Sequence, residues 1–137
     1  MRGALLAGLI ALAVAPFPSA AERALARNGL AVQGDRDGFE VFSRAGLGGV
    51  DYFCAAGDFA RKHLNAAATE RVEIAAPLGP SRSRPGQRSV VFEVRPPGRQ
   101  ANRGLDLVLL RPGVAGVSRT VAQSANFCTR PDIGEQD

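Results

Sequence analysis

Short runs of alternating apolar and polar residues recur along the chain. In residues 89–95, Val90, Phe92 and Val94 occupy every second position, so they share one face of a predicted strand. Residues 71–75 alternate in the same way. Further strand-like runs lie at residues 30–32, 39–42, 105–110 and 117–123. Together these runs predict about six short strands.

The connections between these runs are polar or rich in glycine and proline. Residues 34–38 have the composition of a hairpin turn. Asp35 and Asp37 within it match the start of a calcium-binding loop, but the later oxygen ligands and the closing glutamate are missing. Residues 77–88, with their prolines and glycines, predict irregular structure, and residues 22–28 predict a loose lead-in.

A different periodicity predicts one helix over residues 50–65. Apolar residues recur there at three- and four-residue steps. The largely apolar stripe contains Val50, Phe53, Cys54, Gly57, Ala60, Arg61 and Leu64. Asp51 in the first turn and the basic residues 61–63 in the last turn suit the helix dipole. Because glycine weakens a helix by about 1 kcal/mol relative to alanine, we expect Gly57 to permit a close approach to the strands beneath.

The first 21 residues have the features of a removable secretory signal peptide. A positive charge at Arg2 precedes an apolar run over residues 4–15, and Ser19 and Ala21 supply the small residues of a cleavage site. The apolar run is well short of the roughly 20 residues that span a bilayer, so we expect no membrane span after cleavage. The predicted organisation is a signal peptide (1–21), a single domain (22–130) and a flexible tail (131–137), in a periplasmic or secreted protein.

Cys54 and Cys128 are the only two cysteines. Export would place them where disulfides form and persist, and their spacing lacks the Cys-x-x-Cys pattern of a redox pair. Closing a loop of roughly 74 residues contributes on the order of 4 kcal/mol in the chain-entropy model. The sequence therefore predicts a structural disulfide within an α+β fold, in which one main helix packs on a mainly antiparallel sheet of about five to six short strands.

The basic charge narrows the class of partner. The formal net charge is +4, Lys62 is the only lysine, and the arginine bias beside abundant alanine and glycine is typical of a skewed nucleotide composition. Export separates the protein from nucleic acid, so a nucleic-acid partner is not expected. A basic exported protein instead meets anionic lipid or polysaccharide.

One segment is a candidate for such a contact. Arg82, Arg84 and Arg88 lie close together in the predicted irregular connection. They predict either a solvated, mobile connector or an electrostatic contact with an anionic envelope component. Association through them would be salt-sensitive, because exposed charges are screened over about 8 Å at physiological ionic strength.

Catalytic and metal-binding patterns are sparse. His63 is the only histidine, so a zinc site built on histidines would lack ligands. Nine residues at about 100° each place it on the opposite side of the predicted helix from Cys54, which excludes a cysteine–histidine dyad. Neither a nucleophile elbow, a phosphate loop nor a dinucleotide fingerprint is present in the sequence. We expect no metal and no cofactor.

Two weaker patterns involve the helix. The glycine-rich residues 46–49 either turn the chain or offer backbone amides to an anion. Asp51 and Asp58 would lie about 10 Å apart along the helix, which is long for a glycosidase-like acid/base pair. We instead expect Asp58 to form a surface ion pair with Arg61 or Lys62.

Several segments carry a resemblance. Residues 39–41, the stretch Phe53-Cys54-Ala55-Ala56-Gly57-Asp58, residues 89–92 and Cys128 resemble small exported proteins of Gram-negative bacteria that carry an aromatic-Cys-Ala-Ala-Gly-Asp helix motif. The resemblance covers most of the mature chain, although only the helix motif is distinctive. It supports the domain layout and the cysteine pairing, and it implies no catalytic residue.

These observations favour a non-enzymatic envelope module that binds another protein or an anionic surface. The alternative is a small periplasmic hydrolase or transferase whose carboxylate or serine residues the sequence does not identify. A thiol-active protein is a third hypothesis, and it requires a free Cys54.

Overall fold

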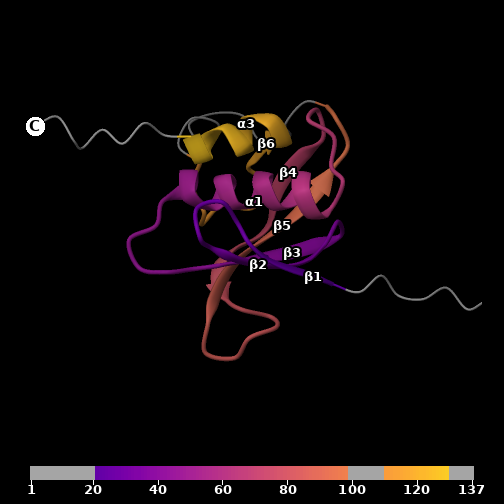
Figure 1. Cartoon of the computed structure of the whole chain (residues 1–137). Coiled ribbons are helices and arrows are strands. Elements are labelled where there is room, and N and C mark those ends of the chain that lie inside the picture. The colour runs from indigo at the N-terminus through magenta and orange to yellow at the C-terminus, as the bar shows by residue number, and fades with distance from the viewer. Residues whose placement is uncertain (1–20, 99–109, 130–137) are drawn as a thin grey trace, which may run out of the picture.

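The computed structural model describes residues 21–98 and 110–129 and has the predicted α+β architecture (Figure 1). Within these residues six antiparallel strands form one sheet in the order β1-β2-β3-β5-β4-β6. The main helix lies across one face of this sheet. The strands are β1 (Glu22–Leu25), β2 (Ala31–Asp35), β3 (Gly38–Phe42), β4 (Arg71–Pro80), β5 (Arg88–Arg95) and β6 (Ser118–Thr120); the helices are α1 (Gly49–His63), α3 (Val121–Asn126) and the short 3-10 helix η1 (Phe127–Thr129).

The β2–β3 turn is the predicted hairpin. An Asp35 carboxylate oxygen accepts hydrogen bonds from the backbone amides of Asp37, at 2.9 Å, and Gly38, at 3.2 Å. The side chain therefore closes the turn as an aspartate commonly does. Gly34 has a φ of 146°, and an added Cβ would lie 2.3 Å from the Gly38 carbonyl oxygen, so glycine is required beside the turn.

The prediction of irregular structure over residues 77–88 is wrong at both ends. β4 continues to Pro80 and β5 begins at Arg88, so only residues 81–87 form the connection. The β4–β5 register shifts between Ile74 and Ala76 and again between Ala76 and Gly79. These irregularities accommodate Pro77, which has no amide hydrogen to give to the ladder.

The predicted lead-in over residues 22–28 is also wrong in part. Residues 22–25 form β1, which pairs antiparallel with β2 from Glu22 opposite Gly34 to Leu25 opposite Ala31. These four residues have little apolar alternation, so their strand depends on the edge that β2 offers.

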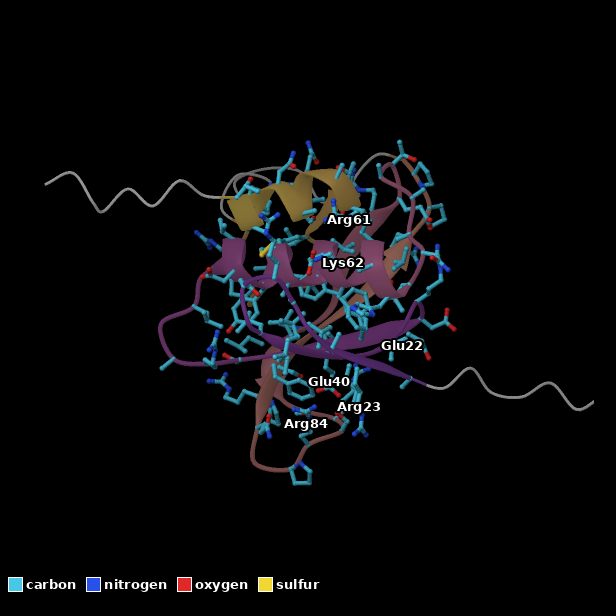
Figure 2. All side chains as sticks on the ribbon, viewed as in Figure 1. Glu22, Arg23, Glu40, Arg61, Lys62 and Arg84 are labelled. Atoms are coloured by element: carbon cyan, nitrogen blue, oxygen red, sulfur yellow. A yellow bond between two sulfur atoms is a disulfide. The ribbon has the colours of Figure 1, made fainter. Side chains whose placement is uncertain are left out.

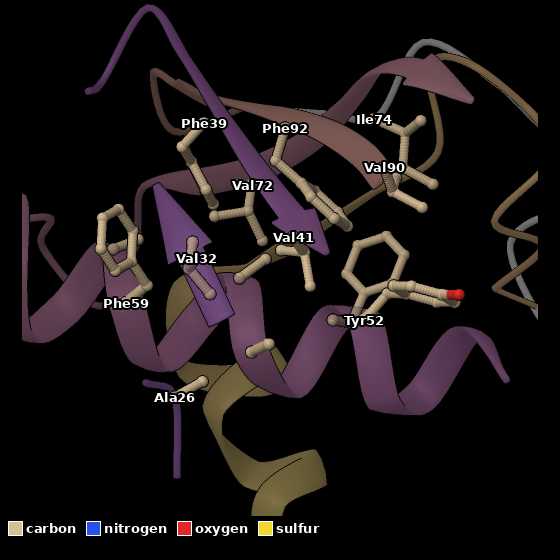
Figure 3. Packing of buried hydrophobic residues seen from close by; sticks show 14 of the residues in the cluster. Ala26, Val32, Phe39, Val41, Tyr52, Phe59, Val72, Ile74, Val90 and Phe92 are labelled. Carbon is tan, nitrogen blue, oxygen red and sulfur yellow. The ribbon is translucent and has the colours of Figure 1, made fainter. Parts of the chain in front are cut away.

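The main core lies between α1 and the sheet (Figure 3). The Phe53 ring meets the Phe92 ring edge-on at 5.2 Å between centroids, and Phe59 lies 5.4 Å from Phe39. Aromatic pairs of this kind add about 0.5–1.5 kcal/mol beyond their area burial. Every residue from Tyr52 to Ala60 is buried, including those that point away from the sheet.

That all-round burial arises because α3 covers the outer side of α1. The strand predicted over residues 117–123 ends at Thr120, where a helix starts instead. The Thr120 hydroxyl accepts a hydrogen bond from the Gln123 amide at 3.1 Å, and Gln123 reaches back to the Thr120 amide. This capping box starts α3.

Gly57 serves a close approach, but to α3 and not to the strands as expected. An added Cβ would lie 2.5 Å from the Ser124 Cβ and 2.6 Å from the Ala125 nitrogen. Real Cβ atoms do not come this close, so glycine allows the two helices to touch at this point.

The predicted disulfide is confirmed. Cys54 in α1 is bonded to Cys128 in η1, with 4.9 Å between the two Cα atoms and a sequence separation of 74. The bond therefore joins the main helix to the last described element of the chain.

Three predictions concern residues outside the described ranges: the signal peptide before Ala21, the strand at 105–110 except Leu110, and the tail at 131–137. Among the described residues, none of the helices has the length and apolar character needed to cross a bilayer.

Candidate functional site

Glu40 organises the sheet face that lies opposite α1. It belongs to β3, where Phe39 and Val41 join the core, so its side chain points to the other face. One carboxylate oxygen, Oε2, accepts hydrogen bonds of 2.6 Å from each of the Ser81 and Ser89 hydroxyls. The backbone amides of residues 82 and 83 donate to the same carboxylate at 3.2 and 3.1 Å.

These donors decide the ionisation of Glu40. Glu40 is only 7% exposed, and burial by itself raises the pKa of a carboxyl group. The hydrogen bonds from Ser81, Ser89, Ser83 and the Arg82 backbone outweigh that effect and hold the pKa of Glu40 below its ordinary value of 4.5. The group is therefore a buried carboxylate at neutral pH.

The carboxylate holds the 81–87 connection folded against the sheet. Figure 2 shows Glu40 and Arg84 together on the side of the sheet away from α1. The Arg84 guanidinium lies 4.0 Å from the centre of the Phe42 ring and donates to the Gln33 side chain at 3.4 Å. Arg84 is thus packed into the fold through a cation–π contact.

Arg88 lies elsewhere, in the wall of an open pocket of about 580 Å³. One wall is the segment from Ser43 to Leu47, between β3 and α1, and the other contains Leu78 and residues 86–88. The pocket therefore lies where the β4–β5 hairpin meets the start of α1. Arg82 lines a separate, smaller cavity of about 210 Å³ beside Glu40.

Backbone and side-chain hydrogen bonds fix the two walls. The Ser43 amide donates to the Arg88 carbonyl at 2.8 Å, which continues the β3–β5 ladder from the pair Phe42–Ser89. The Ser43 hydroxyl lies 2.6 Å from the hydroxyl of Tyr52, whose side chain comes from the buried face of α1. Arg44 donates to the Asn28 carbonyl at 3.4 Å.

The pocket is electropositive. Arg44 and Arg88 both line it, and its described lining includes no aspartate or glutamate. Clefts lined by one sign of charge raise the local concentration of oppositely charged ligands. Since guanidinium groups offer several donors in a planar fork, the arrangement suits carboxylate or phosphate groups.

The glycine-rich start of α1 has another role. The Gly48 amide donates to the Asp51 carboxylate at 2.9 Å. The Asp51 side chain therefore takes the hydrogen bond that this amide could otherwise give to an external anion. An added Cβ on Gly49 would lie 1.6 Å from the Leu110 carbonyl oxygen. Glycine is needed there for packing.

The acidic residues of α1 do not form an acid/base pair. Asp58 is buried, accepts a hydrogen bond from the Arg27 amide at 2.9 Å, and has Lys62 Nζ 2.9 Å and Arg61 3.6 Å from its other oxygen. This confirms the expected partners of the ion pair, but the Asp58 carboxylate is buried and does not lie on the surface as expected. Figure 2 shows Arg61 and Lys62 on the exposed side of α1.

His63 is exposed at the C-terminal end of α1. Its ring centre lies 5.2 Å from that of Phe59. Among the described residues, no group of three or more histidine, cysteine, aspartate or glutamate side chains is arranged to hold a metal ion.

Sequence reasoning identified Arg88 but missed Glu40, Arg44 and Tyr52. Glu40 carries a weak signal, since it is a single acid between Phe39 and Val41 in a strand-like run. Nothing in the linear pattern associates Arg44 with Arg88, because the pocket forms only when the hairpin folds beside the β3–α1 connection.

Comparison with known proteins finds no counterpart: the chain matches no protein-family model, no curated protein and no solved structure.

Proposed function

We propose that this protein is an exported, non-enzymatic module that binds an anionic component of the bacterial envelope. The single observation that carries the proposal is the pocket lined by Arg44 and Arg88, whose described lining has no acidic residue. Arg88 belongs to the arginine-rich segment predicted to contact anions, and the fold places a second arginine in the same pocket.

Export is supported by the signal-like N-terminal sequence and by the disulfide. Cleavage after Ala21 would release a chain that starts at Glu22, the first residue of β1. The Cys54–Cys128 bond suits an oxidising compartment. Both observations support a periplasmic or secreted location.

Binding is favoured over hydrolysis by the roles of the buried acids. Glu40 accepts hydrogen bonds that hold the 81–87 connection, and Asp58 accepts the Arg27 amide and pairs with Lys62. Both carboxylates are committed to structural contacts. The hydroxyls of Ser81 and Ser89 donate to Glu40 and are committed in the same way.

Export is tested by expressing the full-length precursor in a Gram-negative host and weighing the protein recovered from the periplasmic fraction. We expect the mass of residues 22–137, lowered by two hydrogens for the disulfide. Recovery of a protein that retains residues 1–21, or that has two free thiols, would contradict the proposal.

Binding is tested by co-sedimentation of the exported protein with vesicles of zwitterionic lipid, alone or mixed with an anionic phospholipid. We expect binding only to the anionic vesicles, weakening with salt. The double variant Arg44→Gln/Arg88→Gln should lose it. The variant Arg23→Gln/Arg95→Gln loses the same charge on exposed strand residues and should bind almost as the wild type.

Equal loss in both double variants would mean that net charge alone drives binding, which would overturn the pocket as the site. Absence of binding to vesicles and to a soluble anionic polysaccharide would overturn the proposed function.

A further inference from the structure

We infer that the Arg44–Arg88 pocket selects a phosphate monoester, either free or as a lipid headgroup; this inference rests on the proposed function and names its ligand class. The charge of the pocket favours this class of ligand. The described lining includes two arginines and no aspartate or glutamate. A phosphate monoester carries about −1.5 to −2 at pH 7 and balances both, whereas a phosphate diester carries a single charge.

Two neighbouring hydroxyls at the pocket provide a further hydrogen-bond donor. The hydroxyls of Ser43 and Tyr52 lie 2.6 Å apart, and either can donate to the other. Two hydroxyls carry two protons, and their mutual bond uses one. Among the described residues, the Ser43 hydroxyl has one further acceptor, the Arg44 carbonyl, at the long distance of 3.4 Å. The pair therefore has a proton available for a ligand oxygen at the edge of the pocket.

These donors suit an acceptor-only group. One arginine belongs to each wall, and Ser43 and Tyr52, whose hydroxyls are paired, line the pocket with them. The three terminal oxygens of a phosphate monoester accept hydrogen bonds from several directions at once, so such a group can engage both arginines and a hydroxyl together. A ligand that presents its own donors would find no carboxylate among the described lining residues to receive them.

The size of the pocket and the apolar part of its wall suit an organic ester of phosphate. A volume of about 580 Å³ is far larger than a bare phosphate needs and lies in the range of ligand pockets. Leu47 and Leu78 also line the pocket, and both pack against the core. They offer an apolar surface to the organic part of the ester, such as a glycerol or sugar unit.

The sequence supplies a built-in probe of this pocket. Tyr52 is the only tyrosine in the chain, and tryptophan is absent. Its hydroxyl lies at the pocket, so intrinsic tyrosine fluorescence reports on that location alone. A ligand oxygen that takes a hydrogen bond from the Ser43–Tyr52 pair changes the environment of this fluorophore.

The experiment titrates the exported protein with glycerol 3-phosphate, inorganic phosphate and a soluble phosphate diester at fixed ionic strength. Tyrosine fluorescence is followed, and calorimetry provides an independent measure. We expect a saturable response to the monoester and at least tenfold weaker binding of the diester. Arg44→Gln and Arg88→Gln should each weaken monoester binding about tenfold or more, because each removes charge-assisted hydrogen bonds. Arg23→Gln/Arg95→Gln should leave it within about twofold.

Vesicles containing phosphatidic acid, a monoester headgroup, or phosphatidylglycerol, a diester headgroup, form the second arm. Preference for phosphatidic acid with no response to glycerol 3-phosphate would support the inference and identify a lipid as the source. A response to the soluble monoester with no vesicle preference would support it and identify a free ligand.

Equal binding of monoester and diester, in both arms, would overturn the ligand class. If binding to anionic vesicles still depended on Arg44 and Arg88 in that case, the proposed function would stand, but without a preference for phosphate monoesters. If binding of every anionic probe were insensitive to both arginines, the proposed function would fail as well.

Discussion

The Ser81 hydroxyl donates a 2.6 Å hydrogen bond to the carboxylate of Glu40 across 41 residues of sequence. This bond joins the connection between β4 and β5 to the middle of the sheet. The same connection leads directly into Arg88, so a buried acid on the sheet helps to hold one wall of the Arg44–Arg88 pocket in place.

We expect Glu40→Gln to destabilise the protein by about 1–3 kcal/mol. The substitution replaces a charged acceptor of several hydrogen bonds with an amide that brings unwanted donors against Ser81 and Ser89. Urea denaturation measures the change. Glu93→Gln, on a partly exposed residue that pairs with Arg95 at 3.4 Å, is the control and should stay within about 0.5 kcal/mol. An equal effect of both substitutions would contradict the structural role of Glu40.

The contribution of Glu40 should depend on pH in one direction. Its pKa in the folded protein lies below the ordinary value of 4.5 found in the unfolded chain. The stability it contributes is therefore complete above about pH 5 and is lost as pH falls through the folded pKa. The difference in unfolding free energy between wild type and Glu40→Gln should shrink over that acid range. A difference that grows on acidification would contradict the assigned direction.

Reduction of the disulfide should remove on the order of 4 kcal/mol of stability, as expected for a closed loop of 74 residues. Denaturation with and without reductant measures the loss. The variant Cys54→Ala/Cys128→Ala should be weakened in oxidising buffer and should not respond to reductant. A wild-type protein that is equally stable in both conditions would disprove a stabilising role for the bond.

Gly57→Ala should destabilise the protein by about 1–3 kcal/mol, although alanine favours helices. The added Cβ would lie 2.5 Å from the Ser124 Cβ and must separate α1 from α3. That strain exceeds the gain of about 1 kcal/mol in helix propensity. Thermal unfolding measures the net effect. Gly38→Ala is the control for an added methyl group that meets no neighbour, because no heavy atom lies within 4 Å of its added Cβ. If Gly57→Ala were more stable than the wild type, α1 and α3 would not be closely packed at this point.

The local patterns predicted the elements whose own residues determine them. Alternation along residues 89–95 predicted β5, and three- and four-residue spacing predicted α1 within two residues at each end. Short-range periodicity is sufficient there because each element buries one continuous face.

Other elements depend on distant partners and were missed. β1 forms because the edge of β2 offers it hydrogen bonds, and residues 77–80 extend β4 because register shifts accommodate Pro77. α3 follows a capping box at Thr120 that a strand-like apolar pattern concealed. In each case the interaction that decides the element is not visible in the local alternation of apolar and polar residues.

By itself, the sequence determined the fold class and the pairing of Cys54 with Cys128, because these follow from periodicity, residue counts and residue chemistry. Only the tertiary structure decided how the arginines are used. It packs Arg84 on Phe42 and places Arg88 in one pocket with Arg44. The physical reason is that burial and electrostatic potential are sums over neighbours in space, and residues 43–47 and 86–88 become neighbours only when β3 pairs with β5.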